Sequence, residues 1–190
     1  MDPRVWATNK AHSLLYLFSR ECPRVVIWST SLTSPSDRRV WFGSRHRRAR
    51  TFVGDDWLER IRSATIHRYL MPPNSFEDIN DVGTWVSRAA ITPLSMDALS
   101  NLPVAMGTMG VDLQSLPRLT PLKSVWQTTL HASGIRMRNA RDWGPAEWSY
   151  SKPRSGFRWS RSRTGRSATW LREEDSSALG VKYSTEPLAG

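Results

Sequence analysis

The order of apolar and polar residues predicts several short strands in the first 140 residues. Val25-Val26-Ile27-Trp28 is a nearly continuous apolar, β-branched run, which is typical of a strand buried on both faces. Residues 65–70 alternate between apolar and polar positions, and Met71-Pro72-Pro73 ends them. Further strands are expected over residues 5–8, 84–87 (continuing weakly to 91) and 111–116.

A period of 3.6 residues predicts helices between these strands. Residues 10–19 place Ala11, Leu14, Leu15 and Phe18 on one face, with Asn9 as the cap. Residues 121–133 form the clearest helical pattern, with Pro121 in the first turn and Gly134 at the stop. A helix is expected to begin at Asp55-Asp56, and another covers 95–109 with an interruption at Pro103.

The remaining segments before residue 140 are a polar loop over 29–37 and an ambiguous stretch over 38–50. In the latter, Val40-Trp41-Phe42 has an extended pattern and Arg45-His46-Arg47-Arg48 has the composition of an exposed segment. Because most strands are followed by polar loops rather than by regular βαβ units, we predict an α+β fold with a small mixed sheet and packed helices.

Organised periodicity ends near residue 140. Residues 141–190 scatter tryptophans among arginine, serine and glycine with neither a strand nor a helix period. We therefore expect two parts, an α+β domain over 1–140 and a disordered tail over 141–190.

Charge permits contact with anionic partners without identifying one. The chain has a net charge of +10, and 39% of its residues are hydrophobic. Residues 1–140 contribute +7 (eighteen basic, eleven acidic) and the tail +3 (nine basic, six acidic). The tail segment 154–163 interleaves arginine with aromatic residues, a composition that can hold RNA. Since the tail is not the main source of basicity, RNA binding is the alternative rather than the leading hypothesis.

Cysteine and histidine usage limits the possible chemistry. Cys22 is the only cysteine, which excludes an internal disulfide and a multi-cysteine zinc site. Because Cys22 follows an expected helix end, no helix dipole lowers its pKa, and a buried structural thiol is favoured over a nucleophile. The four histidines lack metal-ligand spacing, so we expect no metal. No signal peptide or membrane-spanning run is apparent, and a cytoplasmic location is expected.

Three blocks of sequence resemble one family of small bacterial and fungal proteins that is catalogued as a domain of unknown function. The blocks are Val5-Trp6-Ala7 through Arg20-Glu21-Cys22-Pro23-Arg24-Val25, then Trp57-Leu58-Glu59-Arg60 through Pro72, then Trp85-Val86-Ser87-Arg88 through Ser133-Gly134-Ile135-Arg136-Met137-Arg138-Asn139-Ala140. Members of the family typically begin with about thirty more residues that include a strand. The resemblance therefore implies that this chain is N-terminally truncated, as a shortened gene model would be.

The layout also resembles ADP-ribosyltransferase-like domains at the level of fold. That resemblance implies that Tyr16 stacks on a nicotinamide, that NAD is the cofactor, and that residues 84–88, with Ser87 and Arg88, form the late strand. In such domains this strand usually supplies a glutamate, whereas here Ala89-Ala90 follows Arg88. Without that acid, ADP-ribosyl transfer would be severely slowed, so we expect a catalytically inactive chain.

Arginines of the family blocks suggest a binding site. Arg20, Arg24, Arg136 and Arg138, together with Asn139, can form a clamp for phosphate or carboxylate, since guanidinium groups bind such anions through two hydrogen bonds. We expect Arg136 and Arg138 to point the same way if their backbone is extended. The alternative is structural: these arginines cap helix carbonyls or pair with Asp55, Asp56 and Glu59.

From these residues we expect the domain to bind a nucleotide-like or other anionic small ligand. An RNA-binding module and a protein-interaction surface made of exposed tryptophans are the alternatives.

Overall fold

The computed structural model describes residues 4–81, 83–144 and 180–184, and these residues divide between two compact units. Unit 1 draws on Met1–Arg20, Ala64–Leu102 and Ser160–Gly190, and unit 2 on Glu21–Ser63 and Pro103–Trp159. The chain therefore passes from unit 1 to unit 2 and back again twice. A combination of helices and sheets confirms the predicted α+β class.

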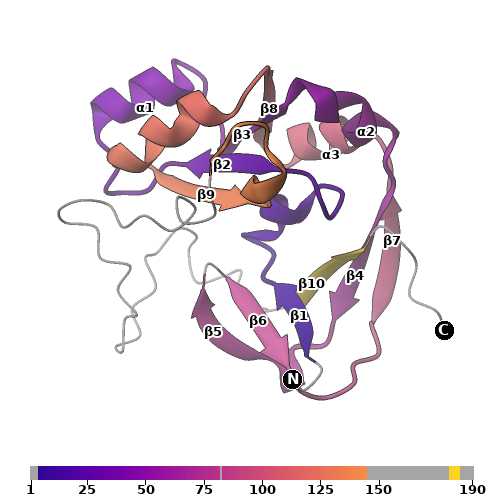
Figure 1. The fold of residues 1–190 in the computed structure, drawn as a ribbon. Coiled ribbons are helices and arrows are strands. Elements are labelled where there is room, and N and C mark those ends of the chain that lie inside the picture. Colours follow the sequence, from indigo (N-terminus) through magenta and orange to yellow (C-terminus); the bar gives the residue numbers. More distant parts are fainter. Residues whose placement is uncertain (1–3, 82, 145–179, 185–190) are drawn as a thin grey trace. The chain divides into compact units, whose positions relative to one another are not determined.

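Unit 1 contains a six-stranded antiparallel sheet in the order β5-β6-β1-β10-β4-β7 (Figure 1). Its strands are β1 (Val5–Thr8), β4 (Ile66–Met71), β5 (Glu77–Asp81), β6 (Thr84–Ser87), β7 (Ser95–Leu99) and β10 (Gly180–Ser184). The 3₁₀ turns η1 (Ser13–Tyr16) and η3 (Pro73–Ser75) connect neighbouring elements. Strands β1, β4 and β6 were predicted at nearly these bounds.

Unit 2 contains a four-stranded mixed sheet in the order β8-β3-β2-β9, which corresponds to the predicted small mixed sheet. Its strands are β2 (Arg24–Trp28), β3 (Ala49–Gly54), β8 (Val111–Leu116) and β9 (His131–Ile135), and only the β3–β8 pair is parallel. Its helices are α1 (Pro35–Phe42), α2 (Leu58–Ser63) and α3 (Leu102–Thr108), with 3₁₀ turns η2 (Asp55–Trp57), η4 (Thr120–Gln127) and η5 (Met137–Asn139). Every residue of β2 is buried, as the continuous apolar run predicted.

The core of unit 2 extends past the predicted domain boundary at residue 140. Trp143 is only 4% exposed and joins a cluster that includes Val25, Ile27 and Val125. Its ring lies edge-on to Trp126 with centroids 5.9 Å apart, and the Lys123 ammonium lies 5.3 Å from its centroid. Trp143, predicted to lie in the tail, is instead a core residue of unit 2.

The predicted helix over 10–19 is instead the short 3₁₀ turn η1. Leu14, Leu15, Leu17 and Phe18 are all buried, so apolar side chains leave this segment in several directions rather than from one helical face. Asn9 does not cap a helix. Its Oδ1 accepts the backbone N–H of His12 at 2.9 Å and closes a turn.

Val40-Trp41-Phe42, which has an extended pattern in the sequence, belongs to the second half of α1. Ser34 caps this helix by accepting the Asp37 N–H at 3.1 Å, and Pro35 occupies the first turn. Both are standard helix-start signals. They lie inside the segment assigned to a loop, which explains why the helix was missed.

Two further predicted helices contain strands. Within 95–109, β7 pairs with β4 and only Leu102–Thr108 is helical. Within 121–133, the apolar stripe forms η4, and the following residues enter β9, which pairs with β2. Gly134 lies inside β9 rather than at a helix stop, and a Cβ there would approach Met137 Cγ to 3.1 Å. Sheet pairing overrides the helical period in both segments.

The predicted disordered tail lies largely outside the described residues. Where the structure does describe it beyond residue 144, it has a strand: β10 pairs with β1 on one side and β4 on the other. No pattern in the sequence indicated this strand. Among the described residues, no helix is both long and apolar enough to cross a membrane.

Replacing Trp143 tests whether it is a core residue. Because its large side chain is buried, Trp143→Ala should lower the free energy of unfolding by about 3–5 kcal/mol. Trp6 is 53% exposed, so Trp6→Ala is the control, with an expected loss under about 1 kcal/mol. Urea unfolding followed by circular dichroism measures both, and equal losses would contradict a core role for Trp143.

Asp37 predicts how stability changes with pH. Hydrogen bonds from the hydroxyl (2.5 Å) and backbone N–H (2.8 Å) of Thr129 hold the pKa of the Asp37 carboxyl below its usual value. A folded-state pKa below the unfolded one stabilises the fold at neutral pH, and this contribution is lost as pH falls below about 4. Asp37→Asn should therefore be less stable than wild type at pH 7, with a gap that narrows in acid. A gap independent of pH would contradict this account.

Candidate functional site

Several of the predicted binding residues meet at one end of the unit 2 sheet. Arg24 begins β2 and lies opposite Ile135, the last residue of β9. Arg136, Arg138 and Asn139 follow directly in and around η5. The pairing of these two strands therefore brings residues more than a hundred positions apart in the chain to one place.

A left-handed backbone at Arg136 redirects the chain from β9 into η5. Its φ is 56° and its ψ 30°, a conformation that most residues with a side chain avoid. The backbone at Arg136 and Arg138 is therefore not extended, and the condition for strand alternation is not met. The sharp turn, rather than strand alternation, brings both arginines to the same partner.

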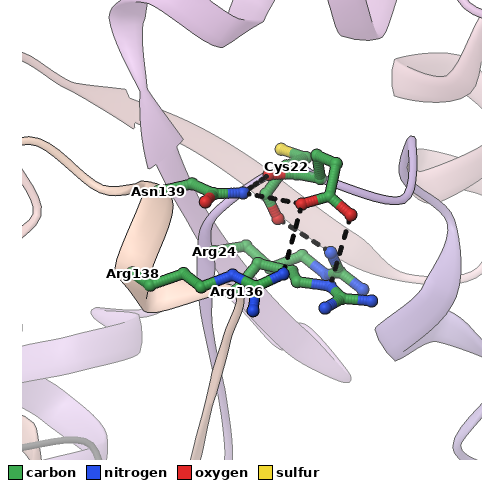
Figure 2. Close-up of polar contacts among 6 residues, drawn as sticks. Cys22, Arg24, Arg136, Arg138 and Asn139 are labelled. Carbon is green, nitrogen blue, oxygen red and sulfur yellow. Dashed lines mark hydrogen bonds and ion pairs between the residues drawn. The ribbon is translucent and has the colours of Figure 1, made fainter. Parts of the chain in front are cut away.

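That partner is Glu21, which with Arg136, Arg138 and Asn139 forms what we call the Glu21 cluster. Asn139 Nδ2 donates to the backbone oxygen of Glu21 at 2.8 Å and to its Oε2 at 3.0 Å. Arg136 Nε lies 3.9 Å from Oε1, and an Arg138 terminal nitrogen lies 3.7 Å from Oε2. Figure 2 shows the three side chains pointing toward this one carboxylate.

The ion pairs of the Glu21 cluster are long and open to solvent. The side chains of Glu21 and Arg138 are 51% and 68% exposed, and that of Arg136 is 33% exposed. Exposed pairs of this kind contribute only about 0–1 kcal/mol each to stability. The structural alternative of pairing with Asp55, Asp56 or Glu59 is not the arrangement seen for Arg136 and Arg138. Glu59 instead lies 3.9 Å from Arg62.

Arg24 and Cys22 are buried, unlike the exposed side chains of the Glu21 cluster. Arg24 is 3% exposed, and one of its terminal nitrogens donates to the backbone oxygen of Cys22 at 2.9 Å (Figure 2). Cys22 is fully buried, and burial raises the pKa of its thiol to about 12 although the charge of Arg24 opposes the shift. The predicted buried structural thiol is what the structure shows.

The other predicted site residues belong to unit 1. Tyr16 ends η1 and is half-buried, and Arg20 is exposed. Ser87 ends β6, is buried, and accepts the Ala89 N–H on its Oγ at 3.1 Å, whereas Arg88 is exposed. The structure thus brings Arg24, Arg136, Arg138 and Asn139 together in unit 2, and places the other four predicted residues in a different unit.

Sequence reasoning missed Glu21 as a functional candidate. It stands between Arg20 and Cys22 in a family block, and a lone acid within an arginine-rich site was the available signal. Within the described parts of the chain, no group of three or more His, Cys, Asp or Glu side chains is arranged to hold a metal ion.

Comparison with known proteins agrees with the resemblance seen in the sequence. The model of a family described as "Family of unknown function (DUF6886)" matches residues 1–140. The chain belongs to this family. No curated protein and no solved structure matches the chain. The family match covers every residue of the Glu21 cluster, so the cluster lies within the family domain.

The buried thiol gives a direct test of the site's chemistry. A pKa raised from 9.0 to about 12 lowers the thiolate population about a thousandfold at mildly alkaline pH. Cys22 of the native chain should therefore react with Ellman's reagent at least about a hundredfold more slowly than in concentrated guanidinium. Since Cys22 is the only cysteine, the signal needs no background variant. Similar rates in both conditions would contradict a buried, protonated thiol.

Proposed function

We propose that the family domain binds a small anionic ligand, nucleotide-like or otherwise, at the Glu21 cluster. The observation that supports this most directly is that two guanidinium groups and an amide already converge on a carboxylate. Carboxylate and phosphate oxygens accept hydrogen bonds from the same donors. A ligand anion would take the place that the Glu21 carboxylate now occupies.

Weak internal pairing makes this exchange feasible. The arginine–Glu21 distances of 3.7 and 3.9 Å exceed those of direct charge-assisted hydrogen bonds, about 2.7–2.9 Å. A ligand that reaches hydrogen-bonding distance therefore gains more from the arginines than Glu21 gives up. The cluster also has two positive charges against one negative charge, so a dianion such as a phosphate monoester is favoured.

The backbone at Arg136 supports a functional rather than purely structural role. Strained conformations at residues other than glycine cluster at binding and active sites, where surrounding structure maintains them. Here the strain aims a guanidinium at an exposed carboxylate, a contact that contributes little to stability.

We propose binding without turnover. Cys22, which follows Glu21 in the chain, is protonated at neutral pH, because burial raises the pKa of its thiol to about 12. The RNA-binding alternative rests on residues 154–163, which lie outside the described residues. The protein-interaction alternative rests on exposed tryptophans, and among the described tryptophans Trp6 is the exposed one, at 53%. Neither observation favours these alternatives over a small ligand.

The proposal predicts opposite effects from two kinds of substitution. Arg136→Ala combined with Arg138→Ala should abolish binding of the anion, because it removes both guanidinium groups. Glu21→Gln should tighten binding up to about fivefold, because it removes the competing carboxylate. The ion pairs of that carboxylate with the arginines contribute about 1 kcal/mol or less. Isothermal titration of the full chain with AMP and citrate at constant ionic strength measures both effects.

The control is Arg39→Ala combined with Arg62→Ala, which removes the same charge from exposed helix positions of unit 2. Thermal unfolding confirms that each variant is folded. Three results would each reject the proposal: no binding of either probe, equal affinity in the cluster and control variants, or weaker binding by Glu21→Gln.

A further inference from the structure

A second basic feature of unit 2 lies at the C-terminal end of α1. A cavity of about 280 Å³ is lined by Arg38 from α1, by residues 43–48 of the loop that leads to β3, and by Phe42 and Ser29. We call it the α1–β3 pocket. Four arginines (Arg38, Arg45, Arg47 and Arg48) line it together with His46, and no carboxylate does.

Most of these arginines have no counter-charge. Among the described residues, the side chains of Arg38, Arg45 and Arg47 make no ion pair or hydrogen bond. Arg50, two residues past the pocket, shows the contrast. It lies 2.9 Å from Asp112 and donates to the backbone oxygen of Trp41 at 2.6 Å. The fold pairs the arginine next to the pocket and leaves Arg38, Arg45 and Arg47 available.

The helix end does not account for this charge. The C-terminus of an α-helix carries a partial charge of about −0.5, which arginines can offset. The full positive charge of a single guanidinium group already exceeds this partial charge. A net positive charge of about 2.5 therefore remains on Arg38, Arg45 and Arg47. Residues 38–54 contain no acidic residue to reduce it.

The loop that supplies the arginines is anchored at both ends. The N–H of Gly43 donates to the Arg39 oxygen at 2.9 Å, and the N–H of Arg48 donates to the Gly110 oxygen at 3.0 Å. At the inner side, Phe42 is 3% exposed and Ser29 is buried. Anchored donors lose less conformational freedom when a ligand binds than donors of an unrestrained loop do.

The size of the pocket limits what it can hold. A volume of about 280 Å³ lies just below the range of about 300–1,000 Å³ seen for ligand sites. Three or four guanidinium groups around such a volume match a compact anion with several charges. Arginine is the side chain best suited to phosphate oxygens, because its planar group donates two parallel hydrogen bonds.

We propose that the α1–β3 pocket binds the pyrophosphate group of a small phosphorylated compound, with Arg38, Arg45 and Arg47 as the residues that contact it. This site differs from the Glu21 cluster. Arg24 stands at the first position of β2 beside that cluster, whereas Ser29 follows the last position of β2 in the pocket. Five residues of strand separate the two by about 15 Å.

Isothermal titration of the full chain with sodium pyrophosphate, at constant ionic strength, tests the proposal. We expect pyrophosphate to bind at this pocket, with affinity reduced at least about tenfold in Arg45→Gln combined with Arg47→Gln. If that variant is unstable on thermal unfolding, Arg38→Gln tests the same pocket from α1 and should also weaken binding. Arg39→Gln combined with Arg62→Gln removes equal charge outside the pocket and should bind as wild type does.

A further variant distinguishes the α1–β3 pocket from the Glu21 cluster. Arg136→Ala combined with Arg138→Ala should leave pyrophosphate affinity unchanged, which distinguishes the pocket from the Glu21 cluster. Equal loss in the pocket and charge-control variants, or no binding of pyrophosphate, would each overturn the proposal.

Discussion

Complete burial of β2 is the constraint on which the rest of unit 2 depends. Val25, Val26 and Ile27 have no exposed surface, and the strand is hydrogen-bonded to β3 on one side and β9 on the other. A strand enclosed in this way can present side chains to solvent only at its ends. The Glu21 cluster lies at its first residue and the α1–β3 pocket just beyond its last, so both candidate sites follow from where the buried strand begins and ends.

The arginines of unit 2 differ in how fully their charges are satisfied. Arg24 is buried against a backbone oxygen, and Arg50 is held by Asp112 and a carbonyl group, so both serve the fold. Arg136 and Arg138 share one exposed carboxylate at long distance. Arg38, Arg45 and Arg47 have no side-chain partner among the described residues. The net charge of the chain says nothing of this difference, which only the structure reveals.

The sequence predicted strands better than helices, for a physical reason. The run from Val25 to Trp28 is apolar because both faces of β2 are buried, so local pattern and tertiary role agree. Residues 121–133 have a helical stripe, but the second half pairs with β2, and partners distant in the chain leave no local signal. Helix α1 did have a signal in Ser34 and Pro35, and its apolar Val40-Trp41-Phe42 run concealed it.

The candidate site was partly predictable. Arg24, Arg136, Arg138 and Asn139 came from family blocks, and strand pairing brings them together. Glu21 had one signal, a lone acid among arginines, but its contact with Arg136 and Arg138 depends on the left-handed turn at Arg136, which has no local signal. The α1–β3 pocket was out of reach, since residues 43–48 show only an exposed basic composition until α1 and β3 are placed around them.

The central claim is that unit 2 binds anions at both ends of β2, and amide chemical shifts of the ¹⁵N-labelled chain test it most directly. During separate titrations with pyrophosphate and AMP at constant ionic strength, the account predicts saturable shifts confined to two groups, Ser29 with residues 43–48, and residues 21–24 with 136–139. Shifts spread evenly over exposed arginines elsewhere, such as Arg88 and Arg118, or no shifts at all, would contradict it.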